Sequence, residues 1–198
     1  MRPLTLAVLL VACTQAPAAS TGTPLRTATA TASPATSPTA VVFASTSYRY
    51  SITLPIGWVA RPAFAPWDGY GAPNAQDVGV DLFGPTGEIK VDGSVKAFAA
   101  AAPTTSPLDK YVAFGIQVNF RFHGDTCPQT PDSVEPVTIG GQPGTLVAWN
   151  CGILINTAFT VVNGYGYRFS FRDSSVQAAT DPADKATFTT MLRSVVFH

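Results

Sequence analysis

Residues 153–171 read ILINTAFTVVNGYGYRFSF, two runs rich in β-branched and aromatic residues that flank Asn163-Gly164. Asn-Gly between two such runs is the strongest short signal for a β-hairpin, because a tight hairpin turn needs positive φ angles that these residues tolerate. We therefore predict an antiparallel hairpin with strands at 153–162 and 165–171.

A second hairpin pattern precedes the first one. Gly140-Gly141 separates two further alternating runs, 134–139 and 145–150. Paired glycines between strand-like runs favour a two-residue turn for the same conformational reason. We therefore predict a second antiparallel hairpin at 134–150.

Three earlier segments also have strand character. Residues 48–54, YRYSITL, alternate large apolar with polar side chains and stop at Pro55. This pattern predicts a half-buried strand that runs into a turn, with Trp58 starting the return strand. Two more strands are expected at 78–83 and 90–97.

Residues 106–122 fit both a strand and a helix. Apolar residues alternate over 112–122 as in a strand, but an unbroken strand of that length is uncommon. Ser106 supplies an N-cap, Pro107 fits the first helical position, and Asp109 places an acid in the first turn. We predict a helix here.

The C-terminal segment predicts a second helix and a last strand. Asp181-Pro182 opens the helix, and four apolar residues then recur at i, i+3, i+4 and i+7: Phe188, Met191, Leu192 and Val195. A final strand is expected at 196–197. Together these segments predict the α+β class, an antiparallel β-sheet with helices packed on it.

Three of these segments stand in a recognisable order: YRYSITLP at 48–55 followed by Gly57-Trp58, GYGYRFSF at 164–171, and the closing helix and strand at 188–197. Their order and spacing resemble the PsbP/Mog-type α/β/α sandwich, as it occurs in lipoproteins of GC-rich bacteria. The resemblance implies a single PsbP-like domain without enzymatic activity, because known members are accessory binding proteins, such as an extrinsic photosystem subunit and a partner of a small GTPase. It assigns no binding residue to this chain.

The first residues resemble a lipoprotein signal. Residues 1–12 carry one positive charge, at Arg2, and then an apolar run far shorter than the roughly 20 residues that span a bilayer. The string Leu10-Val11-Ala12-Cys13 resembles the lipobox of bacterial lipoproteins, which implies cleavage before Cys13 and acylation of its sulfur. The alternative is a general secretory signal that is cut between Ala16 and Ser20.

The composition then divides the rest of the chain in two. Residues 13–42 are mostly Thr, Ala, Pro and Ser, which bury too little apolar surface to offset the entropy of ordering the chain. All 3 Trp, 6 Tyr and 12 Phe residues lie beyond position 42. We therefore expect a signal peptide at 1–12, a lipidated cysteine and disordered tether at 13–42, and one globular domain at 43–198.

The charge balance limits the classes of partner. The chain has 12 basic and 12 acidic residues, and neither sign forms a run. Nucleic acid and anionic membrane surfaces are therefore not expected as main partners. The expected contact with the membrane is the lipid anchor alone, on the extracytoplasmic face of the bacterial cell membrane, and the protein is expected to be monomeric.

The cysteines agree with an oxidising compartment. If Cys13 carries lipid, Cys127 and Cys151 remain as an even pair, for which we predict a disulfide. A metal site would need further Cys or His residues at ligand spacing, and the chain has only His123 and His198. No metal is expected.

The Pro/Gly-rich stretch 60–77 is the candidate binding surface. It contains Trp67, Asp68 and Tyr70, and aromatic residues on irregular segments are favoured anchors in interfaces. In contrast, Trp58 and Trp149 occupy strand positions, where burial in the core is the expected fate of tryptophan.

Catalytic motifs are scarce. The chain lacks a Gly-x-Ser-x-Gly elbow, and we interpret His123-Gly124-Asp125 as a polar loop held by the disulfide. A glycosidase-like pair among four acids near aromatic residues is the alternative: Asp68, Asp77, Asp81 and Asp92. No nucleotide-binding or EF-hand motif occurs, so no cofactor is expected.

The leading hypothesis is an extracytoplasmic, membrane-tethered and non-enzymatic binding or accessory module, whose partner is an envelope protein or a small ligand. A secreted hydrolase that uses carboxylates between Asp68 and Asp81 is one alternative. A purely structural surface lipoprotein is the other.

Overall fold

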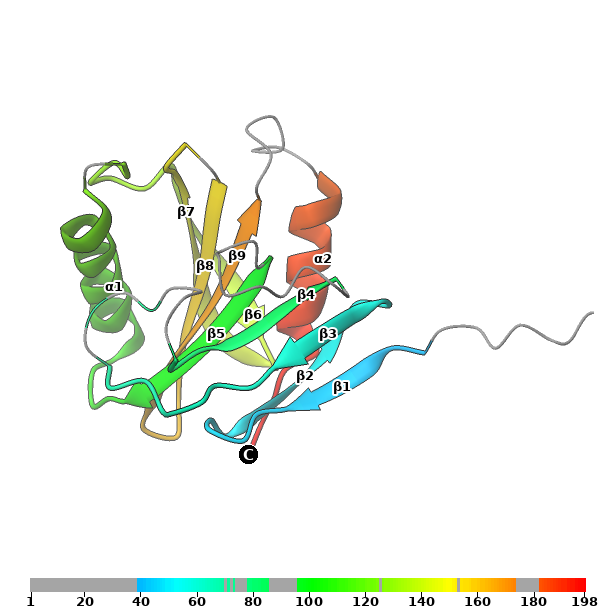
Figure 1. Cartoon of the computed structure of the whole chain (residues 1–198). Coiled ribbons are helices and arrows are strands. Elements are labelled where there is room, and N and C mark those ends of the chain that lie inside the picture. The colour runs from blue at the N-terminus through cyan, green and yellow to red at the C-terminus, as the bar shows by residue number, and fades with distance from the viewer. Residues whose placement is uncertain are drawn as a thin grey trace, which may run out of the picture. The chain divides into compact units, whose positions relative to one another are not determined.

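The hairpin predicted around Asn163-Gly164 lies in the middle of a seven-stranded antiparallel sheet (Figure 1). In this computed structural model, Asn163 and Gly164 have φ angles of 51° and 79°, which both positions of the tight turn require. The structure describes residues 39–198 except 70, 72, 74–77, 86–95, 125, 153 and 174–181. All the described residues belong to one compact unit.

The elements follow the chain as β1 (Val41–Ala44), β2 (Tyr50–Leu54), β3 (Trp58–Arg61), β4 (Asp81–Pro85), β5 (Ala97–Pro103), α1 (Leu108–His123), β6 (Ser133–Ile139), β7 (Gln142–Asn150), β8 (Leu154–Val162), β9 (Tyr165–Asp173), α2 (Pro182–Arg193) and β10 (Val196–Phe197). The large sheet has the order β3-β4-β5-β9-β8-β7-β6, and a small sheet has the order β1-β2-β10. The predicted α+β class is confirmed.

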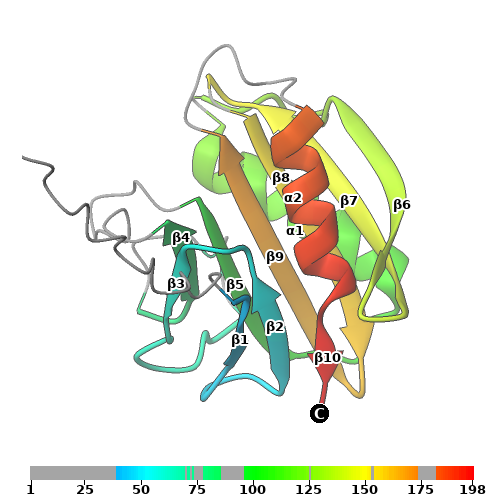
Figure 2. The ribbon, with the colours of Figure 1, turned by 90° about the vertical axis from the view of Figure 1, so that its right-hand side faces the viewer.

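The two faces of the large sheet are covered differently. Helix α1 covers one face, whereas α2 and the small sheet lie on the opposite face (Figures 1 and 2). Strands β9 and β8 are therefore enclosed on both sides, so both sets of their alternating side chains are buried. We call these two sides of the large sheet the α1 face and the α2 face.

The α2 face holds most of the core. Tyr167, Phe169 and Phe171 of β9 point to this side, where the Phe171 ring lies 5.3 Å from that of Phe188 on α2. Tyr50 of β2 packs edge-on against Phe169, with ring centroids 5.3 Å apart. Edge-to-face pairs of this kind add to the stabilisation from apolar burial.

The predicted return strand at Trp58 forms, but it does not pair with β2. Strand β3 pairs with β4 in the large sheet, while both edges of β2 are occupied by β1 and β10. The Trp58 ring stacks on Phe171, with centroids 6.3 Å apart, and so belongs with the large sheet.

The strands predicted at 78–83 and 90–97 are displaced along the chain. Strand β4 begins at Asp81, and β5 occupies 97–103, whereas residues 86–95 lie outside the described residues. Strand β5 is largely alanine, which has low β propensity, so propensity does not reveal it. Its small side chains nevertheless suit a central strand that is enclosed on both faces.

The predicted helix at 106–122 is confirmed as α1, with a shifted N-terminus. Pro107, rather than Ser106, takes the N-cap position in extended conformation, and no side chain caps the helix. The carbonyl of Pro107 accepts the first helical hydrogen bond, from the Tyr111 N–H at 3.0 Å. The second predicted helix forms as α2, and the last strand forms as β10.

Candidate functional site: a cavity beneath α1

The loop proposed as a binding surface does not present its tryptophan to solvent. Trp67 is only 8% exposed, and its backbone N–H donates to the Tyr48 hydroxyl at 2.8 Å. Its ring packs on the Arg168 guanidinium, 4.9 Å from the ring centroid to Cζ. The expectation of an exposed Trp67 is therefore wrong. Asp68 is exposed, and Tyr70 lies outside the described residues.

The candidate carboxylates are not brought together. Asp81 is fully buried on the α2 face, where it accepts hydrogen bonds from the Tyr50 hydroxyl and the Ala63 N–H, each at 2.7 Å. Burial raises the pKa of this carboxyl above 3.8, and its hydrogen bonds offset part of that rise. Asp77 and Asp92 lie outside the described residues.

The other sites considered from the sequence are the histidine next to the disulfide, a metal site and a membrane span. His123 ends α1, although its side chain and Asp125 are not described. Within the described ranges, no three His, Cys, Asp or Glu side chains gather as a metal site requires. No helix of the described part has the length and apolarity to cross a bilayer.

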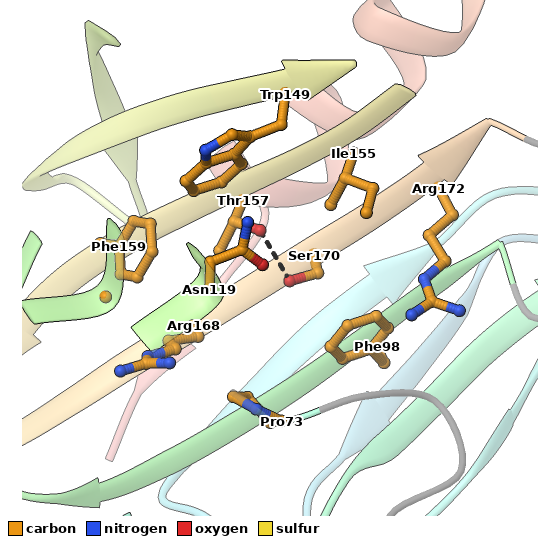
Figure 3. Close-up of a pocket in the computed structure, with 11 residues that line it drawn as sticks. Pro73, Phe98, Asn119, Trp149, Ile155, Thr157, Phe159, Arg168, Ser170 and Arg172 are labelled. Atoms are coloured by element: carbon orange, nitrogen blue, oxygen red, sulfur yellow. Dashed lines mark hydrogen bonds between the residues drawn. The ribbon is translucent and has the colours of Figure 1, made fainter. Parts of the chain in front are cut away.

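The feature that stands out is a small cavity of mixed polar and apolar lining between α1 and the large sheet (Figure 3). Its volume is about 30 Å³, well below the roughly 300 Å³ at which sites for drug-sized ligands begin. The lining comes from the loop before β4, from α1 and from four strands: Pro73, Phe98, Gly115, Asn119, Trp149, Ile155, Thr157, Phe159, Arg168, Ser170 and Arg172.

Helix α1 contributes one row of residues to this region. Tyr111, Gly115 and Asn119 are spaced four apart, so they lie on the same side of the helix, above the sheet. A Cβ atom at Gly115 would clash with the Phe159 ring. The glycine therefore allows the helix to approach the sheet closely and brings its polar neighbours to the cavity.

Strand β9 supplies the charged floor of the cavity. Arg168, Ser170 and Arg172 alternate with the core aromatic residues, so they point to the α1 face. In the register of the sheet, Ser170 lies opposite Thr157 of β8, and their hydroxyl oxygens are 3.0 Å apart. The two hydroxyls satisfy one another, whereas Arg168 and Arg172 on either side of Ser170 each keep at least one N–H without a partner among the described residues.

Six buried polar atoms around this cavity lack a hydrogen-bond partner among the described residues. They are Tyr111 Oη, Asn119 Nδ2, Trp149 Nε1, Arg168 Nε, Arg168 Nη2 and Arg172 Nε. All six can donate a hydrogen bond, and five of them can do nothing else. The partner that would satisfy them must therefore be rich in acceptors.

The two arginines add positive charge to this set of donors. Arg168 is 3% exposed, its Nη1 lies 3.4 Å from the Gly71 carbonyl, and the Tyr111 hydroxyl lies beside its guanidinium. Burial lowers the pKa of both Arg168 and Arg172, but a guanidinium stays protonated in proteins. None of the described residues that line the cavity is a carboxylate, although a buried cation is normally paired.

A disulfide closes the loop that follows α1. Cys127 bonds to Cys151, as the sequence predicts, and Cys151 packs against the buried cluster formed by Trp149, Phe159 and neighbouring residues of the α1 face. The Asn150 N–H, next to Cys151, donates to Asp132 Oδ2 at 2.6 Å. The end of β7 that carries Trp149 is therefore held by both a disulfide and a hydrogen bond.

Comparison with solved structures identifies the architecture. The solution structure of cyanobacterial PsbP (CyanoP) from Synechocystis sp. PCC 6803 superposes with a TM-score of 0.53, covering 80% of this chain and 92% of that one at 15% identity. The chain has a PsbP-like fold. A crystal structure from Bacteroides thetaiotaomicron VPI-5482 matches with a TM-score of 0.41 and 11% identity over 76% of this chain and 45% of the other. No family model and no curated protein matches.

Sequence reasoning missed the cavity of this PsbP-like domain, although a signal for it exists. In the run YGYRFSFR at 165–172, every second residue is aromatic, and the residues between them include Arg168 and Arg172. A strand covered by helices on both faces buries both sets. Two arginines on one face of a predicted central strand therefore indicate either a buried ion pair or a site for an anion.

Proposed function

We propose that this protein is a non-enzymatic accessory module that binds a small anion beneath α1, outside the cytoplasm, while a lipid on Cys13 holds it to the membrane. The observation that carries the proposal is the set of six buried donors, including two cationic side chains, that have no acceptor among the described residues. An unpaired buried charge costs several kcal/mol, roughly, so a bound anion would recover much of that free energy.

The PsbP-like fold supports the accessory part of this proposal. Members of the family that the sequence resembles act as accessory binding proteins, and fold alone does not transfer their partners. The described carboxylates also favour binding over hydrolysis, because Asp81 has both oxygens engaged in the core while Asp68 is exposed. A purely structural role would not account for the two arginines that line the cavity.

The proposed location rests on different observations. The lipobox-like string ending at Cys13 and the tether up to residue 42 support anchoring to the outer side of the cell membrane. The bond between Cys127 and Cys151 supports an oxidising compartment, because cytosolic thiols are kept reduced. We further propose that the protein is monomeric and that its partner beyond the anchor is a small ligand rather than nucleic acid.

Anion binding is tested by thermal unfolding of the full chain in sodium acetate, phosphate and sulfate, with choline chloride keeping ionic strength constant. An anion at a hundred times its Kd stabilises by about 2.7 kcal/mol, which raises Tm by roughly 5–10 °C for a domain of this size. The shift should vanish in Arg168→Met and persist in Arg121→Gln, a control on the exposed side of α1. Equal behaviour of the two variants would refute the proposal.

The location is tested by the intact mass of the protein from its native membrane fraction, measured with and without reduction and alkylation. A diacyl or triacyl increment on a chain beginning at Cys13 is expected, with Cys127 and Cys151 alkylated only after reduction. A soluble chain cut beyond residue 15 would exclude the lipid anchor and leave the anion site untouched.

A further inference from the structure

We propose that the cavity selects a planar carboxylate, held edge-on by Arg168, over tetrahedral oxyanions, and that its natural ligands are short-chain carboxylic acids. This inference rests on the proposed anion-binding function and specifies the ligand class of the same site. Three features of the cavity carry it: the orientation of the free donors of Arg168, the closure of its other sides, and the size and lining of the space.

The first feature is the edge of Arg168 that is left free. Its Nη1 atom faces the Gly71 carbonyl at 3.4 Å, whereas Nε and Nη2 have no partner among the described residues. Nε–H and one N–H of Nη2 point the same way and form one edge of the planar guanidinium. This edge matches the two oxygens of a carboxylate, which it binds through two parallel hydrogen bonds.

The second feature is the aromatic enclosure of the same guanidinium. Four ring centroids lie within 6 Å of its Cζ atom, at 4.9 Å for Trp67, 5.4 Å for Tyr111, 5.5 Å for Phe159 and 5.9 Å for Phe114. The ring faces stabilise the cation, and among these four side chains that of Tyr111 also carries a hydroxyl beside the guanidinium. The rings border the Arg168 guanidinium on several sides. A ligand therefore approaches it in the plane of its free edge.

The third feature is the small space. In a space of about 30 Å³ the shape of the charged group matters, because the three heavy atoms of a carboxylate group lie in one plane whereas the oxygens of phosphate or sulfate form a tetrahedron. A planar group therefore fits beside the fork of Arg168, the pair of N–H groups on Nε and Nη2, with less displacement of α1 than a tetrahedral ion requires. Displacing packed side chains to admit a bulkier group typically costs about 1–3 kcal/mol.

Other donors lie where further lone pairs of a carboxylate could be satisfied. In the view of Figure 3 the Asn119 amide lies between Trp149 and Arg168 and overlaps the Thr157–Ser170 pair. Asn119 Nδ2 and Trp149 Nε1 both lack partners among the described residues. A carboxylate offers about four lone-pair positions, so the fork of Arg168 leaves two for these N–H groups.

The rest of the lining fits a short hydrocarbon body. Pro73, Phe98 and Ile155 are apolar, and Phe98 and Ile155 line the cavity on the side of Arg172 (Figure 3). Arg172 is more exposed than Arg168, and its Cζ lies 5.5 Å from the Phe98 ring centroid. A guanidinium nearer to solvent attracts anions toward the deeper fork, as charged clefts commonly do.

The test compares ligands of matched size on the full chain by isothermal titration at constant ionic strength. Acetate and propionate should bind, whereas acetamide, the neutral isostere of acetate, should not. Sulfate and phosphate should bind at least about tenfold more weakly than acetate, a difference of about 1.4 kcal/mol. Tighter binding of either tetrahedral ion through Arg168 would overturn the selectivity and leave the anion-binding proposal standing. Binding of no anion would overturn both.

The fork itself is tested by Arg168→Lys, which keeps the positive charge and removes the paired donors. Acetate affinity should fall at least about tenfold, in line with the loss of a charge-assisted hydrogen bond, and Arg121→Lys should leave it unchanged. An unchanged affinity in Arg168→Lys would refute edge-on binding. If that variant fails to fold, the Arg168 Nε–H proton of the unmodified chain decides, because acetate should shift its NMR signal and acetamide should not.

A further titration distinguishes a small carboxylic acid from the C-terminal carboxylate of a partner protein. A capped tripeptide with a free C-terminus and its amidated form are titrated beside acetate. We expect neither peptide to bind, because the cavity has no room for a peptide backbone. Binding of the free-acid peptide at least as tightly as acetate would replace the short-chain acid with the C-terminus of a partner protein.

Discussion

The two faces of strand β9 carry opposite kinds of side chain. Tyr167, Phe169 and Phe171 fill the α2 face with stacked and edge-on aromatic contacts. Arg168 and Arg172, one position over, place two cations on the α1 face. The same strand therefore builds a conventional apolar core on one side and a cavity of mixed polar and apolar lining on the other.

Buried charge is handled differently on the two faces as well. On the α2 face, Asp81 has a hydroxyl donor from Tyr50 and a backbone donor from Ala63. On the α1 face, Arg168 keeps two donors without a partner among the described residues. Among the described residues, the ionisable group is therefore satisfied on the α2 face only, and the proposed anion would complete the α1 face.

The largest expected effect is on the α2 face. Phe169→Ala should lower the free energy of unfolding by about 3–5 kcal/mol, because it opens a cavity among rings that are almost fully buried. Urea titration measures this loss. Phe169→Leu, which keeps most of the volume, should lose less than half as much. The neighbouring Ser170→Ala on the α1 face should cost only about 1 kcal/mol, the value of one hydrogen bond. A larger loss at position 170 than at 169 would reverse the comparison.

A second substitution fills the α1 face. Gly115→Val should cost about 1–3 kcal/mol, because the added side chain meets the Phe159 ring and pushes α1 away from the sheet. It should also abolish anion binding. Ala113→Val, on the exposed side of the same helix, carries only the helix-propensity cost of less than about 1 kcal/mol. Urea titration and acetate titration of both variants provide the measurements, and intact binding in Gly115→Val would show that the cavity is not the site.

Removing a buried charge should have opposite consequences on the two faces. Without ligand, Arg168→Met should leave the free energy of unfolding within about 1 kcal/mol of the original or raise it, because an unpaired cation is replaced by an apolar side chain. Asp81→Ala should lower it by about 1–3 kcal/mol, because the Tyr50 hydroxyl and the Ala63 N–H lose their acceptor. Chemical unfolding at pH 7 measures both. A strong loss in Arg168→Met would mean that the arginine has a partner within the chain.

The smallest expected effect is a pH dependence from Asp81. Its pKa is raised by burial in the folded protein, so the folded state holds a proton that the unfolded state releases near pH 3.8. Its contribution to stability is therefore complete below pH 3.8 and is lost as the pH rises through the folded pKa. Asp81→Asn should remove this decline. The free energy of unfolding of the variant should therefore rise relative to that of the original protein as the pH increases from 3.8 through the folded pKa. A difference that does not change with pH would contradict the assignment.

Local sequence signals were sufficient for most of the fold. Asn163-Gly164 and Gly140-Gly141 predict their hairpins because turn conformation is decided by the residues in the turn. The alanines of β5 were missed because their strand conformation depends on neighbours far away in the sequence. The partner of β3 was predicted wrongly for a similar reason, since the pairing of β2 with β10 joins distant parts of the chain.

The cavity was harder to predict than the fold. Arg168 could have been placed on the buried α1 face from the alternation of the run at 165–172. The contribution of Asn119, and the absence of a carboxylate from the described lining, depend on how α1 is set over the sheet. Trp67 was assigned to the surface because its loop is rich in Pro and Gly, and only the tertiary structure shows that Tyr48 and Arg168 hold it inside.

The pairing of β2 with β10 also affects the order of folding. The Thr53 N–H donates to Ser194 Oγ across 141 positions, and Val196 lies opposite Ser51 in the small sheet. Contacts at this separation must overcome a large loop-closure entropy and generally form slowly. When a chain emerges N-terminus first, from a ribosome or through a translocation channel, one edge of β2 stays open until residues 196–197 arrive. An open strand edge invites pairing with other chains, and β10 removes this risk when it closes the edge of β2.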